Sequence, residues 1–331
     1  MELNTILSTH IDTINDFCND VVWKYGYIDE EDDEFYFDFS QIELQTIADE
    51  FISFFELKYP LSLDQLISIC SNSNYFVQPL LENHKPRGYH FEYRDRVHIF
   101  FKENDTPCGK ITTILHELFE IINDNLAKQS ITGKKNSNIE EDADKFSVYV
   151  QVPNSYVFDF INSAGLDVFG LKDHMQCSYA TALIRMNEVL CYSERSDEST
   201  HISMISILYE RKFWENNSCN KIPRLSLGIF CKSKGFPFGM SRSEVRDLRF
   251  NEKFSIRKLI QDNKKYRTNV FLPTLLMTLK NTSLFVNVLI RPVIWKGSNY
   301  ASKVLVQIAP ALGNELKLLA KKINAITINQ G

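Results

Sequence analysis

Residues 115–120 read Leu-His-Glu-Leu-Phe-Glu, inside an amphipathic run that predicts a helix from about Lys110 to Lys128. The His-Glu pair has the register of H-E-x-x-H, a motif that supplies two neutral imidazoles one helical turn apart and a glutamate that activates a metal-bound water. Glu120 stands where that motif has its second histidine. The stretch therefore predicts a metal-site helix whose chemistry depends on Glu120.

A third ligand would have to come from another segment. On a helix, His116 and Glu120 share a face and Glu117 lies beside His116. The acidic segment downstream predicts a second helix, Ile139–Val150, which offers Glu140 and stops at Pro153. A helix with His-Glu, then a loop, then a helix with a carboxylate is the arrangement of zinc peptidases whose third ligand is glutamate.

Three strand-like runs precede the first of these helices, at Tyr75–Leu80, Tyr89–Tyr93 and Arg96–Lys102. His98, on the last strand, could approach the site and replace the missing imidazole, or it could simply be a strand histidine satisfied by hydrogen bonds. His84 and His90 flank a Lys-Pro-Arg-Gly turn, and we expect both to be exposed.

Together these pieces resemble the ImmA/IrrE family of bacterial metallopeptidases. That family reads as a short strand, a T-x-x-H-E-x-x-H helix, and an E-x-x-A-[ND]-x-F-A helix that ends in proline. The corresponding segments here are Thr113–Glu117, Glu140–Phe146 and Val152–Pro153. Cys177–Met186 is similar to the helix-turn-helix-like S-x-x-A-x-x-x-R segment that follows the peptidase core. The resemblance covers roughly residues 59–192.

The resemblance implies metal ligands at His116 and Glu140, with Glu120 in the place of the second histidine. It makes Glu117 the general base and Asp144 the carboxylate that accepts the other N–H of the ligating imidazole. One histidine and two carboxylates form a harder, more negative site, which admits Mn²⁺ or Fe²⁺ beside Zn²⁺. The same negative charge makes the bound water less acidic, which predicts reduced hydrolysis.

The function implied is that of a metalloendopeptidase that cleaves a specific regulatory protein, of repressor or antitoxin type, in a stress, mobile-element or phage-defence response. The alternative is a catalytically degenerate pseudo-peptidase that acts as a protein-binding regulatory module. Glu120 is the residue that separates the two hypotheses.

The N-terminal region predicts helices. Ser40-Gln41-Ile42-Glu43 reads as a capping box that opens a helix through Phe55. Pro60 then ends this helical region, to which we assign residues 1–58.

Charge is divided unevenly along the chain. Residues 1–200 contain 15 Lys and Arg against 35 Asp and Glu, whereas residues 201–331 contain 22 against 7. The basic half favours an anionic partner, a nucleic acid or a nucleotide, especially where cations and aromatic side chains alternate in residues 242–267. Alternatively, the two halves neutralise each other across an internal interface.

Beyond residue 200 the pattern is rich in strands. A capping box at Ser241–Glu244 predicts one helix among them, and Asn314–Ile323 predicts a last, basic one. The predicted strands are Ile202–Tyr209, Leu225–Cys231, Val270–Leu279, Leu284–Trp295 and Val304–Ile308. By the family analogy this region would be a sensor or binding domain.

The seven cysteines are odd in number, scattered, and nowhere paired as C-x-x-C, which favours free thiols and a reducing cytoplasm. We see no signal peptide and no membrane span. The predicted fold is α+β: a helical region over 1–58, a zincin-like metallopeptidase domain over 59–195, and a basic, strand-rich α+β domain over 200–331.

Overall fold

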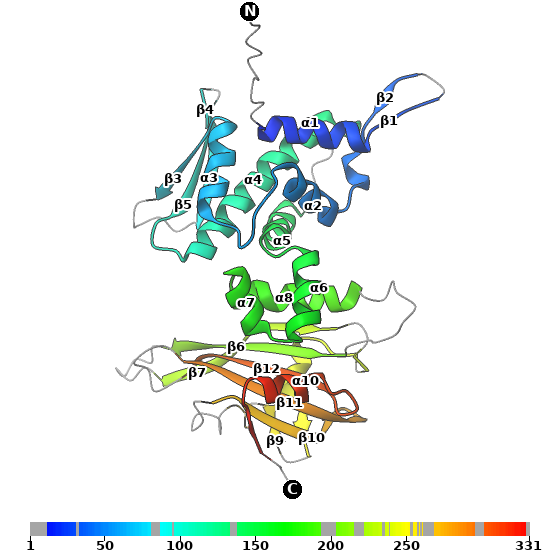
Figure 1. Ribbon diagram of the computed structural model, residues 1–331, viewed down its shortest axis with the longest axis vertical. Coiled ribbons are helices and arrows are strands. Elements are labelled where there is room, and N and C mark those ends of the chain that lie inside the picture. Colours follow the sequence, from blue (N-terminus) through cyan, green and yellow to red (C-terminus); the bar gives the residue numbers. More distant parts are fainter. Residues whose placement is uncertain are drawn as a thin grey trace, which may run out of the picture. The chain divides into compact units, whose positions relative to one another are not determined.

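Figure 1 shows the chain as a computed structural model that divides into two compact units, each treated separately below. Unit 1 comprises residues 1–154 and 172–178, and unit 2 comprises residues 155–171 and 179–331. The structure describes residues 12–30, 33–80, 87–94, 96–132, 138–192, 203–214, 222–233, 236–237, 239–251, 254–256, 258, 260, 268–294 and 301–328. The predicted helical positions before Asp12, the exposure expected for His84, and the predicted boundary at 195–200 lie outside these ranges.

Unit 1 begins with three helices, α1 (Ile14–Tyr25), α2 (Leu44–Phe54) and α3 (Leu63–Asn72), with a two-stranded hairpin, β1 (Tyr27–Ile28) and β2 (Phe35–Tyr36), between the first two. A capping box starts α1, because Thr13 Oγ1 accepts from the Asp16 N–H at 3.1 Å and the Asp16 carboxylate accepts from the Thr13 N–H at 3.1 Å.

The capping box predicted at Ser40 is wrong. Ser40 lies in a short 3₁₀ turn, η1 (Phe39–Gln41), and α2 begins only at Leu44, after Glu43, whose side chain makes no cap hydrogen bond. Asp38 explains the difference. Its carboxylate accepts both the Ser40 N–H at 3.0 Å and the Ser40 hydroxyl at 2.7 Å, so Asp38 caps this turn and takes the N–H that a capping box would offer to Glu43.

A three-stranded sheet follows, in the order β3-β5-β4. Its strands are β3 (Tyr75–Leu80), β4 (Gly88–Tyr93) and β5 (Arg96–Lys102), with β3 parallel and β4 antiparallel to β5. The sequence predicts all three within one residue. Helices α3 and α4 pack on one face, where Ile99 and Phe101 of β5 are buried. The alternate residues therefore face away from these helices.

The predicted metal-site helix is α4 (Pro107–Gln129), and α5 (Ile139–Gln151) packs against it. Helix α4 starts three residues before the predicted Lys110, because Thr106 Oγ1 caps the Gly109 N–H at 3.2 Å and Pro107 suits the first helical position. Phe146 of α5 meets Phe119 of α4 and Phe51 of α2, with ring centroids 4.9 and 5.5 Å apart. These rings anchor α5 in the core.

One hydrophobic core of unit 1 runs from Ile14 to Val150. The helices before residue 58 thus share a core with α4 and α5, and the structure does not divide at the predicted boundary of 58/59. The reason is a cluster of phenylalanine rings. The ring centroids of Phe17 in α1 and Phe51 in α2 lie 5.4 Å apart, and the Phe51 ring also contacts that of Phe146.

Cys18 and Cys70 lie in this core, and burial raises the pKa of each thiol to about 12. Against an ordinary thiol of pKa about 9, this is ~10³-fold less thiolate, the nucleophilic form, at pH 8. We expect iodoacetamide to modify the partly exposed Cys108 in native protein and to spare these two, whose reactivity should increase only as pH rises toward 12. Peptide mass spectrometry measures the extent of modification at each cysteine, with denatured protein as the control. Equal labelling of Cys18 and Cys108 would contradict this packing.

Unit 2 contains α6 (Asn154–Ala164), most of whose residues belong to it, the first part of α7 (Val168–Met175), and α8 (Tyr179–Tyr192). The sequence predicts these helices within the metallopeptidase domain. Long-range contacts assign them to unit 2 instead, since Gln307 Nε2 donates to the Leu166 carbonyl at 2.9 Å and the Arg291 guanidinium lies 4.2 Å from the Phe169 ring. Arg185, in the helix-turn-helix-like segment, is fully buried and pairs with Glu188 at 2.8 Å. That arginine is not presented to solvent.

An eight-stranded, largely antiparallel sheet forms the rest of unit 2, in the order β7-β6-β12-β11-β10-β8-β9, with β13 beside β10. Its strands are β6 (Ile205–Trp214), β7 (Ile222–Lys232), β8 (Arg249–Phe250), β9 (Phe254–Ser255), β10 (Val270–Leu279), β11 (Thr282–Ile294), β12 (Ala301–Pro310) and β13 (Ile326–Thr327). Five of these overlap the five predicted strands, and β7, β10 and β12 contain the predicted ranges in full. The predicted C-terminal helix is α10 (Glu315–Lys322).

The two faces of this sheet are covered differently. On β11, Val286, Val288 and Ile290 belong to a core that also contains residues of the segment between β7 and β10, such as Val245. The alternate residues Asn287 and Arg291 face the other way, toward Gly313 before α10 and Asp167 before α7. The helix predicted after Ser241 is only a 3₁₀ turn, η3 (Ser243–Asp247). One half of the predicted capping box is present, since the Glu244 carboxylate accepts the Ser241 N–H at 2.8 Å.

Among the described residues, no helix is both long enough and apolar enough to cross a membrane. Each unit contains both helices and a sheet, so the mixed α+β class is observed in both. The zincin-like identity of unit 1 remains a prediction, as does the cytoplasmic location.

Candidate metal centre

Helix α4 presents three of the predicted site residues. His116 and Glu120 lie one turn apart on a partly exposed face, with His116 Nε2 3.6 Å from Glu120 Oε1. Glu117 points into the protein, and only 6% of it is exposed. The neighbours Leu115 and Leu118 are fully buried and fix the rotation of the helix.

Helix α5 brings two more carboxylates to His116. His116 Nε2 lies 3.3 Å from Glu140 Oε2, and His116 Nδ1 lies 3.1 Å from Asp144 Oδ1. The structure thus brings together His116, Glu120, Glu140 and Asp144, with each carboxylate on the imidazole nitrogen that its predicted role requires. Glu140 and Asp144 are mostly exposed, so their side chains are free to adjust around an ion.

Polar contacts hold α5 in register with α4. Gln151 Nε2 donates to Thr112 Oγ1 at 2.8 Å, and the Ser147 hydroxyl lies 3.2 Å from the Thr112 carbonyl. Both contacts come from the same helix, one to two turns beyond Asp144. With the Phe146 packing described above, they fix the rotation of α5 and so the direction in which its carboxylates project.

Strand β4 brings a residue that sequence reasoning missed. His90 Nδ1 lies 2.7 Å from Glu117 Oε2 and 3.4 Å from Glu120 Oε2. The sequence predicts that His90, beside a turn, is exposed, but His90 is half-buried and faces α4. The sequence signal is only the strand alternation of Gly88, His90 and Glu92, which becomes informative once the register against α4 is known.

Gly88 allows this approach of β4 to α4. A Cβ atom at Gly88 would come within 2.1 Å of the Thr113 methyl group and 2.6 Å of the Phe100 carbonyl oxygen. Any larger residue would therefore push the strand, and with it His90, away from Glu117.

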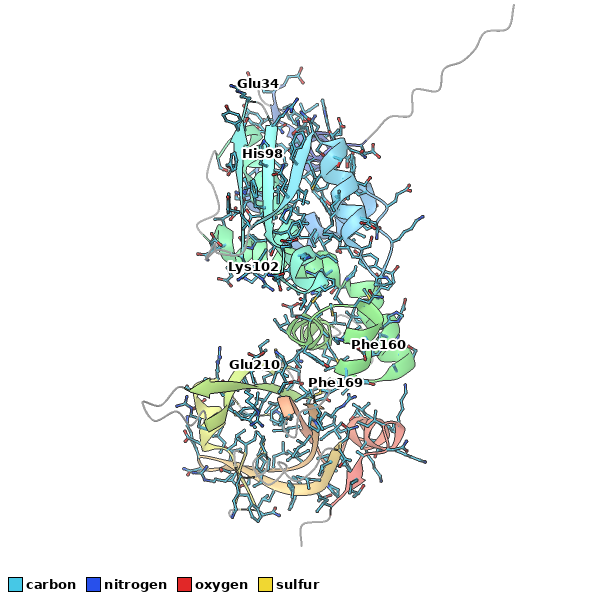
Figure 2. The ribbon with its side chains drawn as sticks, turned by 90° about the vertical axis from the view of Figure 1, so that its left-hand side faces the viewer. Glu34, His98, Lys102, Phe160, Phe169 and Glu210 are labelled. Carbon is cyan, nitrogen blue, oxygen red and sulfur yellow. The ribbon has the colours of Figure 1, made fainter. Side chains whose placement is uncertain are left out.

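His98 is not part of the centre. It lies on the opposite face of the sheet, in the middle strand labelled in Figure 2, and stacks on Phe91 and Phe76 with ring centroids 5.2 and 5.3 Å away. As a replacement for the missing imidazole, His98 is excluded by this orientation. His90 occupies the position toward the helix instead.

The acidic surroundings raise the pKa of both histidines. The Glu120 carboxylate, followed by that of Asp144, raises the pKa of His116 to about 9. Hydrogen bonding to Glu117 raises the pKa of His90, and the nearby His116 lowers the pKa of Glu120. The four carboxylates outnumber the two histidines, so the cluster suits a cation, which would displace the proton of His116 on entering the site.

Among the described residues of unit 1, two sets of side chains have ligand atoms within 4.8 Å of one another: His116 with Glu120 and Glu140, and His90 with Glu117 and Glu120. Glu120 belongs to both. One imidazole nitrogen and two carboxylate oxygens are donors that suit Zn²⁺, Mn²⁺ or Fe²⁺. The donor set therefore fits a divalent transition metal.

No protein-family model matches the chain, and no curated protein sequence matches it. Among solved structures, it is similar to one described as a Mycobacterium tuberculosis transcriptional regulator, at 11% sequence identity and a TM-score of 0.48, over 96% of this chain and 88% of that one. A likeness this distant does not bear on function.

Proposed function

We propose that unit 1 is a metal-dependent peptidase of the ImmA/IrrE type whose second histidine ligand is replaced by Glu120. The observation that carries the proposal is the convergence of His116, Glu120 and Glu140, from two different helices, within 4.8 Å. From the family resemblance we further propose that its substrate is a regulatory protein of repressor or antitoxin type, cleaved in a stress, mobile-element or phage-defence response.

The remaining residues have roles in this proposal that their positions support. A bound divalent cation would polarise a peptide carbonyl and lower the pKa of a water molecule. Glu117, buried beside the ligand helix face, would accept the proton of that water. Asp144 would hold the His116 ring through Nδ1, at the 3.1 Å contact already present. His90 would orient the Glu117 carboxylate through the 2.7 Å contact.

Glu120→His tests whether this is a peptidase-type centre. Restoring a second imidazole one turn from His116 should raise the affinity for Zn²⁺ by ~10-fold or more and shift the preference away from Mn²⁺, because imidazole is the softer ligand. Competition titrations with a fluorescent chelator measure both ions. Asp124→His, one turn further along α4, is the matched control. Identical affinities in wild type and Glu120→His would remove Glu120 from the ligand set.

His90→Ala tests the role of the strand histidine. Its loss should lower cation affinity or cleavage by ~10–100-fold, the usual cost of removing a partner that orients a metal site. His98→Ala is the control, because His98 lies on the same sheet but on the other face. The two variants are compared in the same chelator titration and by thermal unfolding. Equal behaviour of His90→Ala and His98→Ala would show that His90 has no part in the centre.

One observation favours a second candidate, the pseudo-peptidase. His90 already contacts an oxygen of Glu117, and His116 contacts three carboxylates, so the ionisable side chains of the cluster have partners within the protein. A chain that has lost catalysis could keep this arrangement as a rigid surface that binds a partner segment. Glu117→Gln, which removes the proposed general base, separates the peptidase from the pseudo-peptidase.

A further inference from the structure

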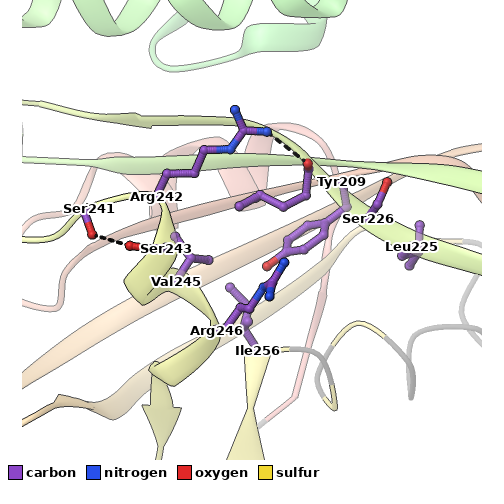
Figure 3. A pocket seen from close by; sticks show the side chains of 10 residues that line it. Tyr209, Leu225, Ser226, Ser241, Arg242, Ser243, Val245, Arg246 and Ile256 are labelled. Atoms are coloured by element: carbon purple, nitrogen blue, oxygen red, sulfur yellow. Dashed lines mark hydrogen bonds between the residues drawn. The ribbon is translucent and has the colours of Figure 1, made fainter.

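Unit 2 contains a pocket of about 750 Å³ between strands β6 and β7 and the segment around η3. Figure 3 shows it from close by. Pockets for small molecules commonly measure about 300–1,000 Å³. The cavity therefore has the size of a site for a small organic molecule.

The lining combines cations and hydroxyl groups with an apolar wall. Arg242 and Arg246 enter from η3 and its start, together with the hydroxyl groups of Ser241 and Ser243. Tyr209 of β6 is buried and lines the same pocket, beside Leu225, Leu227, Val245 and Ile256. None of the described residues that line the pocket is acidic. The lining thus carries positive charge with no internal counter-charge.

The two arginines are used differently. Arg242 Nη2 donates to the backbone carbonyls of Leu227 and Gly228 at 3.2 and 2.7 Å, which fixes its guanidinium across β7; the first of these bonds is drawn in Figure 3. Arg246 has no side-chain hydrogen bond or ion pair with any residue in the described ranges. Its five N–H donors therefore remain available to a ligand that enters the pocket.

Nearby acidic and aromatic groups do not compete for Arg246. Glu244 is bound by Lys280 at 2.5 Å and by the Ser241 N–H and hydroxyl. Phe250, one of the aromatic residues expected to stack on bases in the 242–267 segment, is fully buried in the core instead. Of the other cations in this segment, Arg249 and Lys258 are not among the lining residues, and the rest lie outside the described residues: Lys253, Arg257, Lys264, Lys265 and Arg267. Arg242 and Arg246 are therefore the cations that define this pocket.

We propose that this pocket binds a small phosphorylated molecule, with its phosphate on Arg246 and its apolar or aromatic body against Tyr209 and the aliphatic wall. A guanidinium with free donors binds phosphate through two parallel hydrogen bonds. The apolar residues of the lining favour a ligand with an organic body over a free inorganic ion. The site lies within unit 2, and the proposal is independent of the metal centre in unit 1.

The test is isothermal titration of the full chain with four probes: ADP, decyl phosphate, inorganic phosphate and uncharged adenosine. ADP or decyl phosphate is expected to bind more tightly than inorganic phosphate, and the better of the two identifies a nucleotide or an alkyl body. Arg246→Ala should weaken that binding by ~10-fold or more. Arg249→Ala removes the same charge three residues away, outside the pocket, and should change the affinity by less than about twofold.

Three results would overturn the proposal. The first is adenosine binding as tightly as ADP, because the anion would then go unrecognised. The second is the absence of binding by either phosphorylated organic probe. The third is an oligonucleotide binding while ADP and decyl phosphate do not, with Arg246→Ala and Arg249→Ala weakened equally, which would indicate a general polyanion surface. Because Arg246 is exposed, its removal should leave the unfolding temperature unchanged.

Discussion

Glu117→Gln is expected to lower peptide-bond cleavage by ~10²–10⁴-fold, the usual contribution of a general base. Glutamine keeps the shape of the side chain and can still contact His90, but it cannot accept the proton of a water molecule. Cation content should stay unchanged, because His116, Glu120 and Glu140 are intact. This combination of lost cleavage and retained metal is what distinguishes a base from a ligand.

The measurement works with an unidentified substrate. Cation-loaded wild type and Glu117→Gln are incubated with a cell extract, and new protein N-termini are counted by mass spectrometry. Glu141→Gln is the matched control, since Glu141 is exposed on α5 and pairs only with Lys145 among the contacts observed, at 2.7 Å. Cleavage by wild type and control but not by Glu117→Gln supports the peptidase. If none of the three proteins cleaves, the pseudo-peptidase is the better account.

His116→Ala is expected to reduce cation affinity by more than ~100-fold, since the loss of a mere outer partner of a ligand already costs about 10–100-fold. His116 is the residue on which Glu120, Glu140 and Asp144 all converge, and no other imidazole reaches Glu140 in the described set of ligand groups. Its removal also leaves the carboxylates of Glu120, Glu140 and Asp144 without the imidazole ring that they share. We therefore expect loss of binding even though the carboxylates remain.

Elemental analysis after dialysis against Zn²⁺ or Mn²⁺ gives the result directly, with His98→Ala as the control histidine. Thermal unfolding with and without the ion adds an independent readout, because a ligand that binds only the folded state raises its unfolding temperature. Retention of one ion per chain by His116→Ala would place the cation elsewhere in the protein.

The metal-site helix and its partner were predictable because the signal is local. Apolar residues at helical spacing determine α4 and α5, and the four-residue spacing puts His116 and Glu120 on one face. Strands β3 to β5 were predictable for the same reason, from β-branched and aromatic runs between turn residues.

What the sequence did not predict depends on contacts between distant segments. His90 reaches Glu117 because Gly88 lets β4 approach α4 closely, and neither residue carries a motif. The segment between α6 and α7 belongs to unit 2 through pairs such as Arg291 with Asp167, more than a hundred residues apart, and α8 packs on β6 and β7. The Ser40 capping box failed for a local reason, since Asp38 binds the serine first.

The most direct test of the metal centre is a crystal structure of the protein grown with Zn²⁺, with anomalous data collected at the zinc edge. We expect one peak, within about 2.0–2.2 Å of His116 Nε2 and of one carboxylate oxygen each from Glu120 and Glu140. A structure from zinc-containing crystals with no peak there, and with His116 still paired directly to these carboxylates, would contradict the proposed centre.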